Sequence, residues 1–486
     1  MDPADASPPP PSPVDPGRNW SRTFRYTARE LVRPRSVSEL QALVAGESRV
    51  KALGSRHSFS SVADTPGVLV SLAGIPQQLE VDSAAHTALV GGGVLFGDLA
   101  EQLVAQDLAL GAMASLPHIS VAGGVATGTH GSGTTTQSLA GAIRSLEMVT
   151  ADGDLVTVSP ASHPDTFEGM VVALGALGVI TRLELATLPG FAVRQAVYRD
   201  LPLEHLDQES LETVLDCAYS VSLFTRWHGP AAHQVWVKQK VGAGTAQTGH
   251  AAQAGQAAQT DQAGQTAPGG SAGPTGEDSR TGPAGPRIPT DADSPFPADL
   301  LGAVRAEAPM HPVPGMPAEA CTDQTTAPGP FHERLAHFRS DHTPSSGDEI
   351  QSEYLIDRRH LAEAMTALRA IGAHLQNALQ VSEIRTVASD PLWLSMAEGR
   401  ESVALHFTWT DDHAAVDAAV PLVEEAIAPF EPRPHWGKVT AFSPEVVRSR
   451  YRRADDFAAL VDTWDPRGVF RNAMLEGLGF APNPSA

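Results

Sequence analysis

The sequence lacks several features that mark large classes of protein. Only two cysteines, Cys217 and Cys321, occur among 486 residues, so neither a disulfide framework nor a cysteine-rich metal site is expected. No run of about 18 apolar residues occurs, so no membrane span is expected. Basic residues are few, because 34 Lys and Arg stand against 56 Asp and Glu and leave a net charge of −22. This acidic balance favours solubility and argues against nucleic-acid binding.

Two segments lack the residues needed to build a core. Residues 1–16 are proline-rich, and they contain neither the basic region nor the apolar run of a secretory signal. Residues 242–287 contain no Ile, Leu, Val, Met, Phe, Tyr or Trp, so they cannot bury enough apolar surface to offset the entropy lost on ordering. We therefore predict a disordered N-terminus and a disordered insertion in an otherwise folded, cytoplasmic protein.

The rest of the chain has the composition of a globular protein with helices and strands. Hydrophobic residues make up 42% of the sequence, and the length favours two domains. Residues 33–46 have the cap and the apolar stripe of a helix, with Ser36 or Ser38 as the N-cap. Two alternating runs joined at Asp152 and Gly153 predict a β-hairpin. Further strands are expected at 49–53, 67–72, 382–390 and 403–410, and further helices at 96–110, 414–426 and from about 444 onward.

Two glycine-containing turns are candidates for ligand binding. The first, GSRHS, spans residues 54–58, where Gly54 frees the backbone for a tight turn or a close approach to a ligand. The second lies in ASLPHISVAGGVATGTHGSG, residues 114–133, whose glycines leave backbone N–H groups open to a pyrophosphate. The spacing does not fit G-x-G-x-x-G after a first strand, so a Rossmann site is not expected. Taken alone, either turn could equally be a structural surface loop.

Polar residues alternate along two expected strands near the C-terminus. Glu383 and Arg385 in SEIRT lie two residues apart, so they share one face of a strand, and the same holds for His406 and Thr408 in LHFTW. Such pairs could form cross-strand salt bridges on a solvated face, or they could line a pocket. A pocket would gain a positive charge and an amide from two further residues, Lys438 in RPHWGK and Gln351.

Several runs together resemble one known family. Similarity to the alditol (xylitol) oxidases, a branch of the vanillyl-alcohol-oxidase-type flavoproteins, is carried by ALGSRHSFSSVADTPGVLVSL, ASLPHISVAGGVATGTHGSG, SVSLFTRW, MHPVPGMP, SSGDEIQSEYLI, SEIRT, LHFTW and RPHWGK. These runs cover nearly the whole chain outside 1–16 and 242–287. The resemblance implies an α+β fold with a vanillyl-alcohol-oxidase-type (PCMH-type) FAD-binding domain and a cap domain built on an antiparallel sheet with helices. The implied division is 17–190 for the FAD-binding domain, 191–430 for the substrate or cap domain with the insertion, and 431–486 for a C-terminal segment that completes the active site and the FAD domain.

The resemblance also implies the cofactor and its attachment. In the family, the histidine of the GS-x-HS turn forms a covalent bond from its imidazole to the flavin 8α-methyl group, and His57 is the matching position. That bond needs a neutral imidazole nitrogen as nucleophile. Some relatives have a second, cysteinyl link, but no cysteine lies in the later glycine-rich loop, so one link is expected. Other residues implied to contact FAD are Gly54, Ser55, Arg56 (where the family often has glycine), Ser58, Ser115, Ser120, Gly123, Thr127, Gly128, Thr129, His130, Ile180 and His406.

Substrate residues are implied in the same way. Arg385 and Lys438 suit the stabilisation of negative charge that develops on a terminal hydroxyl as its carbon loses hydride. His406 is the first choice for accepting the hydroxyl proton, and Lys438 could serve instead if its pKa is depressed. Glu383 completes the catalytic candidates. Substrate contacts are implied for Ser115, Gln351, Glu383, Arg385, Thr408 and Lys438.

The implied activity is that of an FAD-dependent oxidase. It would convert the terminal primary alcohol of a linear polyol, such as xylitol or sorbitol, to the aldehyde, while O2 is reduced to H2O2. Two alternatives stay open: an aldonolactone oxidase of the same fold, and a carbohydrate-binding protein that kept the fold without the flavin. The expected partners are therefore a small polyol and O2, with no nucleic acid, membrane or metal, and a monomer is expected.

Overall fold

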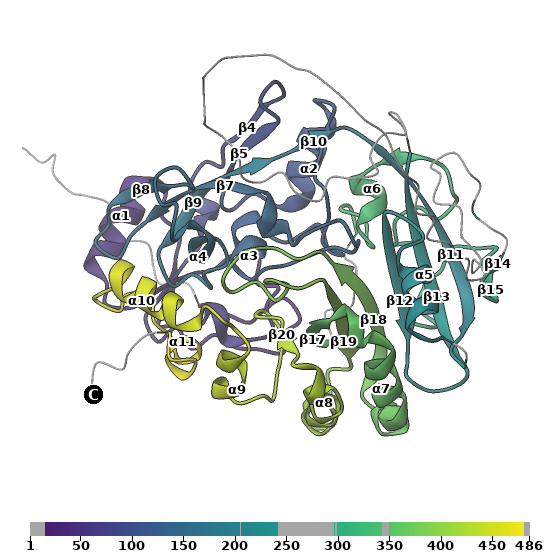
Figure 1. The fold of residues 1–486 in the computed structure, drawn as a ribbon. Helices are drawn as coiled ribbons and strands as arrows, with labels where there is room; N and C mark the ends of the chain where they lie inside the picture. The colour runs from purple at the N-terminus through teal and green to yellow at the C-terminus, as the bar shows by residue number, and fades with distance from the viewer. Residues whose placement is uncertain (1–14, 205, 242–295, 297–298, 343–348, 481–486) are drawn as a thin grey trace, which may run out of the picture.

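The structure, a computed structural model, describes residues 15–204, 206–241, 296, 299–342 and 349–480. Small sheets and helices from the N-terminal half lie on the left in Figure 1, and a large antiparallel sheet with helices lies on the right. This arrangement confirms the predicted α+β fold class. The predicted insertion at 242–287 and most of the proline-rich start lie outside the described residues. Within the described part of the chain, no helix is both long and apolar enough to cross a membrane.

The N-terminal half contains two main sheets, one parallel with the order β1-β3-β2 and one antiparallel with the order β4-β5-β9-β7-β8. A short pair, β6 and β10, adds a third sheet. The strands are β1 (Glu30–Val32), β2 (Val50–Ala52), β3 (Val68–Val70), β4 (Leu79–Asp82), β5 (Thr87–Gly91), β6 (Leu108–Ala109), β7 (Ile143–Val149), β8 (Leu155–Val158), β9 (Val179–Ala186) and β10 (Leu188–Pro189). The helices are α1 (Val37–Gly46), α2 (Phe96–Val104), α3 (Val121–Ala126) and α4 (Phe167–Val171).

Most local signals in this half give the expected elements. The Ser36 side chain, and not that of Ser38, caps α1 by accepting a hydrogen bond from the Glu39 N–H. The predicted hairpin is the β7-β8 pair, and α2 ends earlier than expected because β6 follows it. The strand expected at 49–53 is β2, but its polar residue Lys51 does not face solvent, since it is only 1% exposed. Its Nζ instead donates to the carbonyl oxygens of residues 174 and 175, at 2.8 and 3.1 Å, which satisfies the buried ammonium.

The second half is built on one ten-stranded sheet. Its main path runs β14-β15-β11-β13-β12-β18-β19-β17-β20, and β16 pairs with β11. The strands are β11 (Ala192–Pro202), β12 (Ser220–Thr225), β13 (Ala231–Val241), β14 (Asp299–Leu300), β15 (Ala303–Arg305), β16 (Gly329–Pro330), β17 (Ile350–Asp357), β18 (Leu379–Val387), β19 (Ser402–Trp409) and β20 (Arg433–Pro434). The helices are α5 (Gln208–Leu215), α6 (His332–Leu335), α7 (Leu361–Leu375) and α8 (His413–Ile427).

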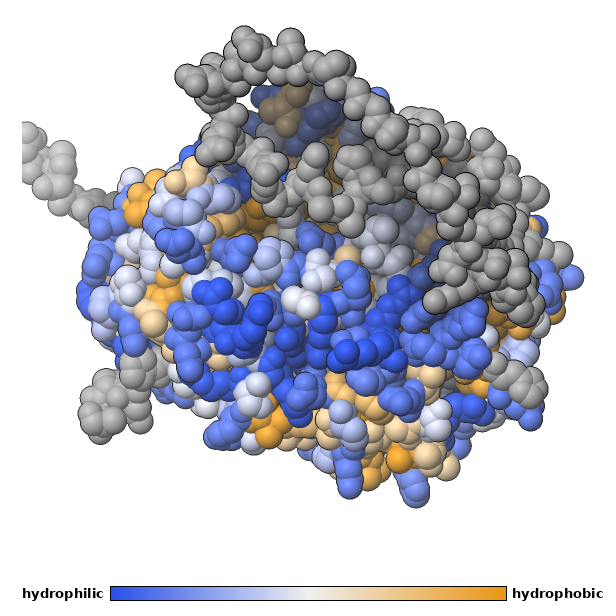
Figure 2. Space-filling model, in the orientation of Figure 1, coloured by the Kyte–Doolittle hydropathy of each residue, from blue (hydrophilic) through white to orange (hydrophobic). Residues whose placement is uncertain are grey.

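This sheet has two chemically different faces, because side chains alternate along each strand. One face packs Tyr354, Ile384, Phe407 and other apolar residues against α5, α7 and α8. In Figure 2 the apolar colour at the lower edge lies over the alanine-rich α7 and α8, while most of the remaining visible surface is hydrophilic. The opposite face of the sheet is polar and turns toward the N-terminal half. That face forms one wall of the site described below.

The C-terminal helices return to the N-terminal half (Figure 1). They are α9 (Pro444–Ser449), α10 (Ala454–Trp464) and α11 (Ala473–Gly477). The Asn472 side chain donates to the carbonyl oxygens of residues 61, 62 and 64, and the Val50 N–H donates to the Val469 carbonyl oxygen at 2.8 Å. Just before these helices, the Gly437 carbonyl oxygen accepts from the Phe59 N–H at 2.6 Å. These contacts are compatible with the division into 17–190, 191–430 and 431–486, which stays a prediction.

Candidate functional site

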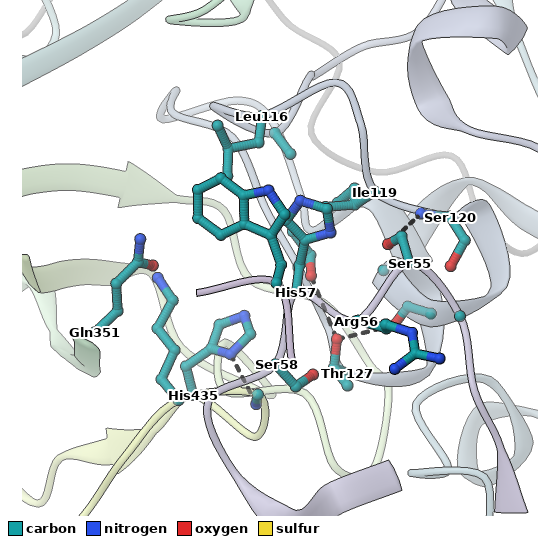
Figure 3. A pocket seen from close by; sticks show the side chains of 18 of the residues that line it. Ser55, Arg56, His57, Ser58, Leu116, Ile119, Ser120, Thr127, Gln351 and His435 are labelled. Atoms are coloured by element: carbon teal, nitrogen blue, oxygen red, sulfur yellow. Dashed lines mark hydrogen bonds between the residues drawn. The ribbon is translucent and has the colours of Figure 1, made fainter. Parts of the chain in front are cut away.

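A cavity of about 520 Å³ lies between the glycine-containing turns and the polar face of the large sheet. Figure 3 shows His57 in the middle of this region, with Ser55 and Ser120 to one side and Gln351 and His435 to the other. The cavity therefore joins the two regions that the sequence analysis treats separately. Its lining includes these predicted residues: Gly54, Ser55, Arg56, His57, Ser58, Ser115, Ser120, Gly123, Thr127, Thr129, His130, Ile180, Gln351, Glu383, Arg385, His406, Thr408 and Lys438.

His57 is held as a neutral imidazole, and one of its two ring nitrogens is unpaired. Burial lowers the pKa of His57 to about 4, although a backbone hydrogen bond at Ser55 opposes the shift. Its Nδ1 atom is buried and has no hydrogen-bond partner among the described residues. The ring stacks on Trp20, with 5.1 Å between the ring centroids. A neutral ring with an unused nitrogen at the wall of the cavity has the properties that the predicted flavin link requires.

The two glycine-containing turns lie against each other. The Ser55 Oγ accepts a hydrogen bond from the Ser120 N–H at 3.0 Å, drawn as a dashed line in Figure 3. A Cβ atom added at Gly54 would lie 2.3 Å from the Ser120 Oγ, so glycine permits this close approach. Much of the second turn is α3, and several N–H groups between residues 124 and 129 donate to carbonyls within the segment. Fewer amides therefore face a ligand than the number of glycines suggests.

Two predicted cofactor residues have backbone conformations that glycine adopts without strain. Arg56 has a φ of +65°. Its guanidinium donates to the carbonyl oxygens of Pro16 and Arg18, so the side chain braces the N-terminal segment. Gly128 has a φ of +66°, and a Cβ atom added there would meet Met396 at 3.4 Å. Gly128 is not among the described residues that line the cavity, and its contact with the cofactor stays a prediction.

Strand register brings the polar residues of the large sheet together. Glu353 on β17, His406 on β19 and Glu383 on β18 are cross-strand neighbours in one row. Gln351 and Thr408 are partners in the next row on the same face. The predicted sharing of one face within each pair is therefore confirmed by the register. Because all five residues line the cavity, this face is a pocket wall and not a solvated surface.

Two cations and two carboxylates meet at this wall. Glu353 Oε1 accepts from Arg385 Nη2 at 2.6 Å, and Glu353 Oε2 accepts from Lys438 Nζ at 2.7 Å. Arg385 Nη1 donates to the Ser115 Oγ at 3.2 Å, and Arg385 Nε lies 3.6 Å from Glu383 Oε1. That Glu383 oxygen has no hydrogen-bond partner among the described residues. Burial lowers the pKa of Lys438, and the Glu353 carboxylate opposes this shift.

His406 is a neutral base candidate in the same wall. Its Nε2 lies 3.2 Å from the Gln351 Oε1, while the Gln351 amide nitrogen donates to Glu349 at 2.6 Å. This orientation of the amide assigns the proton to Nε2 and leaves a lone pair on Nδ1, which lies 3.8 Å from a Glu383 oxygen. Burial, and then the Lys438 charge, hold the pKa of His406 well below its ordinary value. The ring is therefore neutral at neutral pH.

Four residues of the site are not marked as candidates by the sequence patterns: Trp20, His337, Glu353 and His435. For Glu353 a signal exists, because it lies two residues after Gln351, the same spacing as in SEIRT. His435 belongs to the RPHWGK run. His337 comes from a loop, and its Nδ1 lies 2.6 Å from the Ser115 Oγ, a contact between residues 222 positions apart. No local pattern marks such a long-range pair.

The buried histidines predict a loss of stability in mild acid. The pKa values of His337, His406 and His435 lie well below the unfolded value of about 6.5, chiefly because the rings are buried. Below that pH the unfolded chain binds protons that the folded protein does not, so the free energy of unfolding falls as pH falls. Burial raises the pKa of Asp390 to about 6 and also raises the pKa values of Glu424 and Asp465, and these three carboxyl groups oppose the trend.

We therefore expect the midpoint of urea unfolding to decrease from pH 7 to 6 and again to 5, at constant ionic strength. This range lies above the pH at which carboxylates with depressed pKa values take up protons. A midpoint that stays constant or increases on acidification would contradict the assignment of these three rings as neutral.

Comparison with known proteins agrees with this geometry. Residues 28–159 match the family of FAD binding domains, and residues 347–478 match the D-arabinono-1,4-lactone oxidase family. Two solved structures share the fold. Cholesterol oxidase from B. sterolicum has a TM-score of 0.67 and 13% identity, and the match covers 98% of this chain and 99% of that chain. Glucooligosaccharide oxidase from Acremonium strictum has a TM-score of 0.65 and 13% identity, and the match covers 96% of this chain and 94% of that chain. Fold and site together define an FAD-dependent oxidoreductase.

The sequence identities with two known proteins show which family the chain belongs to. An alditol oxidase from a Streptomyces species is 44% identical over 463 residues, which cover 95% of this chain and 98% of the relative. An L-gulono-1,4-lactone dehydrogenase from Mycobacterium tuberculosis is 29% identical over 467 residues, which cover 93% and 96% of the two chains. The chain belongs to the alditol oxidase family of vanillyl-alcohol-oxidase-type flavoproteins.

The residues of this chain fit FAD. The Nδ1 of His57 is a buried polar atom without a hydrogen-bond partner among the described residues, which a bound cofactor could provide. On one side of His57 lie Ser55, Ser120 and Thr127, whose hydroxyl groups line the cavity, and on the other side lie Gln351 and His435. A cofactor in this cavity would therefore lie between the glycine-containing turns and the polar face of the large sheet.

Proposed function

We propose that this protein oxidises the terminal primary alcohol of a linear polyol to the aldehyde, with electrons passing through FAD to O2 and yielding H2O2. The observation that supports this most is the buried wall of two cations, two carboxylates and an amide. A linear polyol carries only neutral hydroxyls, each of which needs a donor and an acceptor. A closed wall of fixed polar groups selects for hydroxyls at matching positions, because a substrate that lacks one of them would leave a buried polar group of the protein unpaired.

The cofactor in this proposal is FAD linked through the His57 imidazole to its 8α-methyl group. When bound, FAD supplies the acceptor for the hydride that leaves the substrate carbon. Ser55, Ser120 and Thr127 would hold it along the cavity, and Trp20 would keep the His57 ring in a fixed orientation. The low pKa of His57 supports a link of this kind, because the ring is neutral across the physiological pH range.

The chain's own residues would act on the reacting hydroxyl as follows. Arg385 and Lys438 donate hydrogen bonds to its oxygen and stabilise the negative charge that develops there. The Nδ1 lone pair of His406 is a candidate to accept its proton. The depressed pKa of His406 makes it a weak base, so most of the stabilisation must come from the two cations. Ser115 and Glu383 would bind a neighbouring hydroxyl.

An aldonolactone oxidase is the second candidate, because the C-terminal half matches that family. Purified protein should be yellow, and a peroxide assay should give a higher rate with xylitol or sorbitol than with L-gulono-1,4-lactone. A higher rate with the lactone would reverse the order of the two candidates. Colourless protein that binds polyols without turnover would instead support the carbohydrate-binding alternative.

We further propose that the protein acts in the cytoplasm as a monomer. The excess of acidic residues supports a soluble protein, and both cysteines are buried and unpaired, as in a reducing compartment. The proposed reaction needs only the polyol and O2 as substrates. Size-exclusion chromatography with light scattering would test the monomer, because a mass well above 51.0 kDa would exclude it.

A further inference from the structure

Glu353 is the carboxylate that connects the two cations of the site. Only 1% of its surface is exposed. Its Oε1 binds Arg385 at 2.6 Å and its Oε2 binds Lys438 at 2.7 Å, so each oxygen serves a different cation. Arg385 belongs to β18 and Lys438 to the loop after β20, and β17 lies between them in the sheet order. One side chain therefore ties together two elements that are far apart in sequence.

The two carboxylates of the wall are in different situations. Both oxygens of Glu353 accept a hydrogen bond from a cation, and the His130 Nε2 also lies 3.5 Å from its Oε1. Glu383, one strand beyond His406 in the same row, keeps an oxygen that has no hydrogen-bond partner among the described residues. That Glu383 oxygen lies 3.4 Å from His337 Nε2 and 3.6 Å from Arg385 Nε, whereas both oxygens of Glu353 accept hydrogen bonds from the two cations.

We propose that Glu353 is a positioning residue that holds Arg385 and Lys438 side by side and charged, facing the reacting hydroxyl. This inference rests on the proposed alcohol oxidation. Two like charges that converge in a buried wall repel each other strongly, because the local dielectric is low. A carboxylate shared between them cancels that repulsion and fixes both side chains in one geometry.

Charge balance supports the same role. Arg385 and Lys438 carry two positive charges, and Glu353 and Glu383 carry two negative charges. The neighbouring rings of His337, His406 and His435 are neutral, because their pKa values lie well below the ordinary value. These four charges therefore sum to zero, which suits an uncharged substrate. Removal of the Glu353 charge alone would leave one uncompensated cation in a buried place.

Glu353→Gln is the decisive variant. Glutamine keeps the size of the side chain, but its amide nitrogen would point N–H donors at Arg385 or at Lys438, which need an acceptor. We expect anaerobic flavin reduction by saturating xylitol, followed by stopped flow, to slow by roughly 10–100-fold, the usual loss when a partner that orients a functional group is removed. The ratio of flavin absorbance to protein should stay at the wild-type value.

The pH profile separates positioning from a merely structural role. Glu353 opposes the effect of burial on Lys438, so its loss lowers the pKa of Lys438 further. The rate of flavin reduction should change around the pH at which Lys438 loses its proton. The midpoint of this pH dependence should therefore move to lower pH in Glu353→Gln. Glu353→Asp keeps the charge but is too short to reach both cations, so the rate should fall while the midpoint stays nearer wild type. The charged or titratable groups near Lys438 are Glu353, Glu383, Arg385, His130, His406 and His435.

Glu398→Gln is the matched control. Glu398 is a buried carboxylate held by Arg433 and Arg452, and it lies outside the lining of this cavity. Its variant should reduce its flavin at the wild-type rate and with the wild-type midpoint. A rate within about threefold of wild type together with an unmoved midpoint in Glu353→Gln would overturn the inference.

Two further outcomes are informative. If Glu353→Gln yields no flavin-loaded protein, Glu353→Asp decides, and a wild-type rate in that variant would overturn the inference. Failure of the proposed function would be recognised differently, because xylitol and sorbitol would then not reduce the wild-type flavin. That result would overturn both, whereas normal reduction of the wild type with an unaffected Glu353→Gln would overturn the positioning role alone.

Discussion

His57→Ala should abolish covalent attachment of the flavin. The His57 imidazole is neutral at neutral pH, and its Nδ1 has no hydrogen-bond partner among the described residues. Alanine removes the imidazole of His57, the only ring in the GSRHS turn to which the flavin could be linked. After acid precipitation, the yellow colour should stay with the wild-type pellet, whereas the variant should release its flavin to the supernatant or fail to load it.

His118→Ala provides the matched control for this experiment. His118 is near enough for its charge to affect His57, but its Nε2 is bonded to the Ser340 carbonyl at 2.9 Å, and it does not line the described cavity. This variant should keep its flavin in the pellet. Wild-type protein that releases its colour on precipitation would show that no covalent link through His57 forms.

Lys438→Ala should slow hydride transfer by about 10²–10³-fold, or roughly 3–4 kcal/mol, the usual value of one donor aimed at a developing oxyanion. Lys438 Nζ is held by Glu353 at the cavity wall, and the Lys438 side chain is 14% exposed. Because the charge on the substrate oxygen develops only during the reaction, the loss should appear in the rate at saturating xylitol. The flavin should stay bound, since the Lys438 side chain bonds to Glu353 in the polar wall, and the contact of this loop with the first turn is made by the Gly437 backbone.

Anaerobic stopped-flow reduction measures this rate directly. Lys240→Ala is a suitable control, because Lys240 lies over the Phe191 ring, with 4.0 Å to its centroid, and outside the cavity lining. A Lys438→Ala rate within about threefold of wild type, with weaker binding alone, would reduce Lys438 to a ground-state contact. His406 would then be the residue to test next.

Local patterns in the sequence predict much of the fold and part of the site. The capping of α1 by Ser36 and the shared faces of Glu383 with Arg385 follow from spacing along the chain, and the structure has both. The burial of Lys51 does not follow, because it depends on carbonyl groups more than 120 residues away. Glu353 is an intermediate case, since its strand face was predictable but its two cationic partners were not.

The return of the C-terminal segment has a consequence for the biogenesis of the enzyme. The Phe59 N–H bonds to the Gly437 carbonyl, the Ser60 Oγ bonds to the Trp436 carbonyl, and the Asn472 side chain bonds to residues 61–64. The neighbourhood of His57 is thus completed by residues that follow it by 376 to 411 positions in the chain. During synthesis, these contacts around the GSRHS turn can form only after residues 436–472 have left the ribosome.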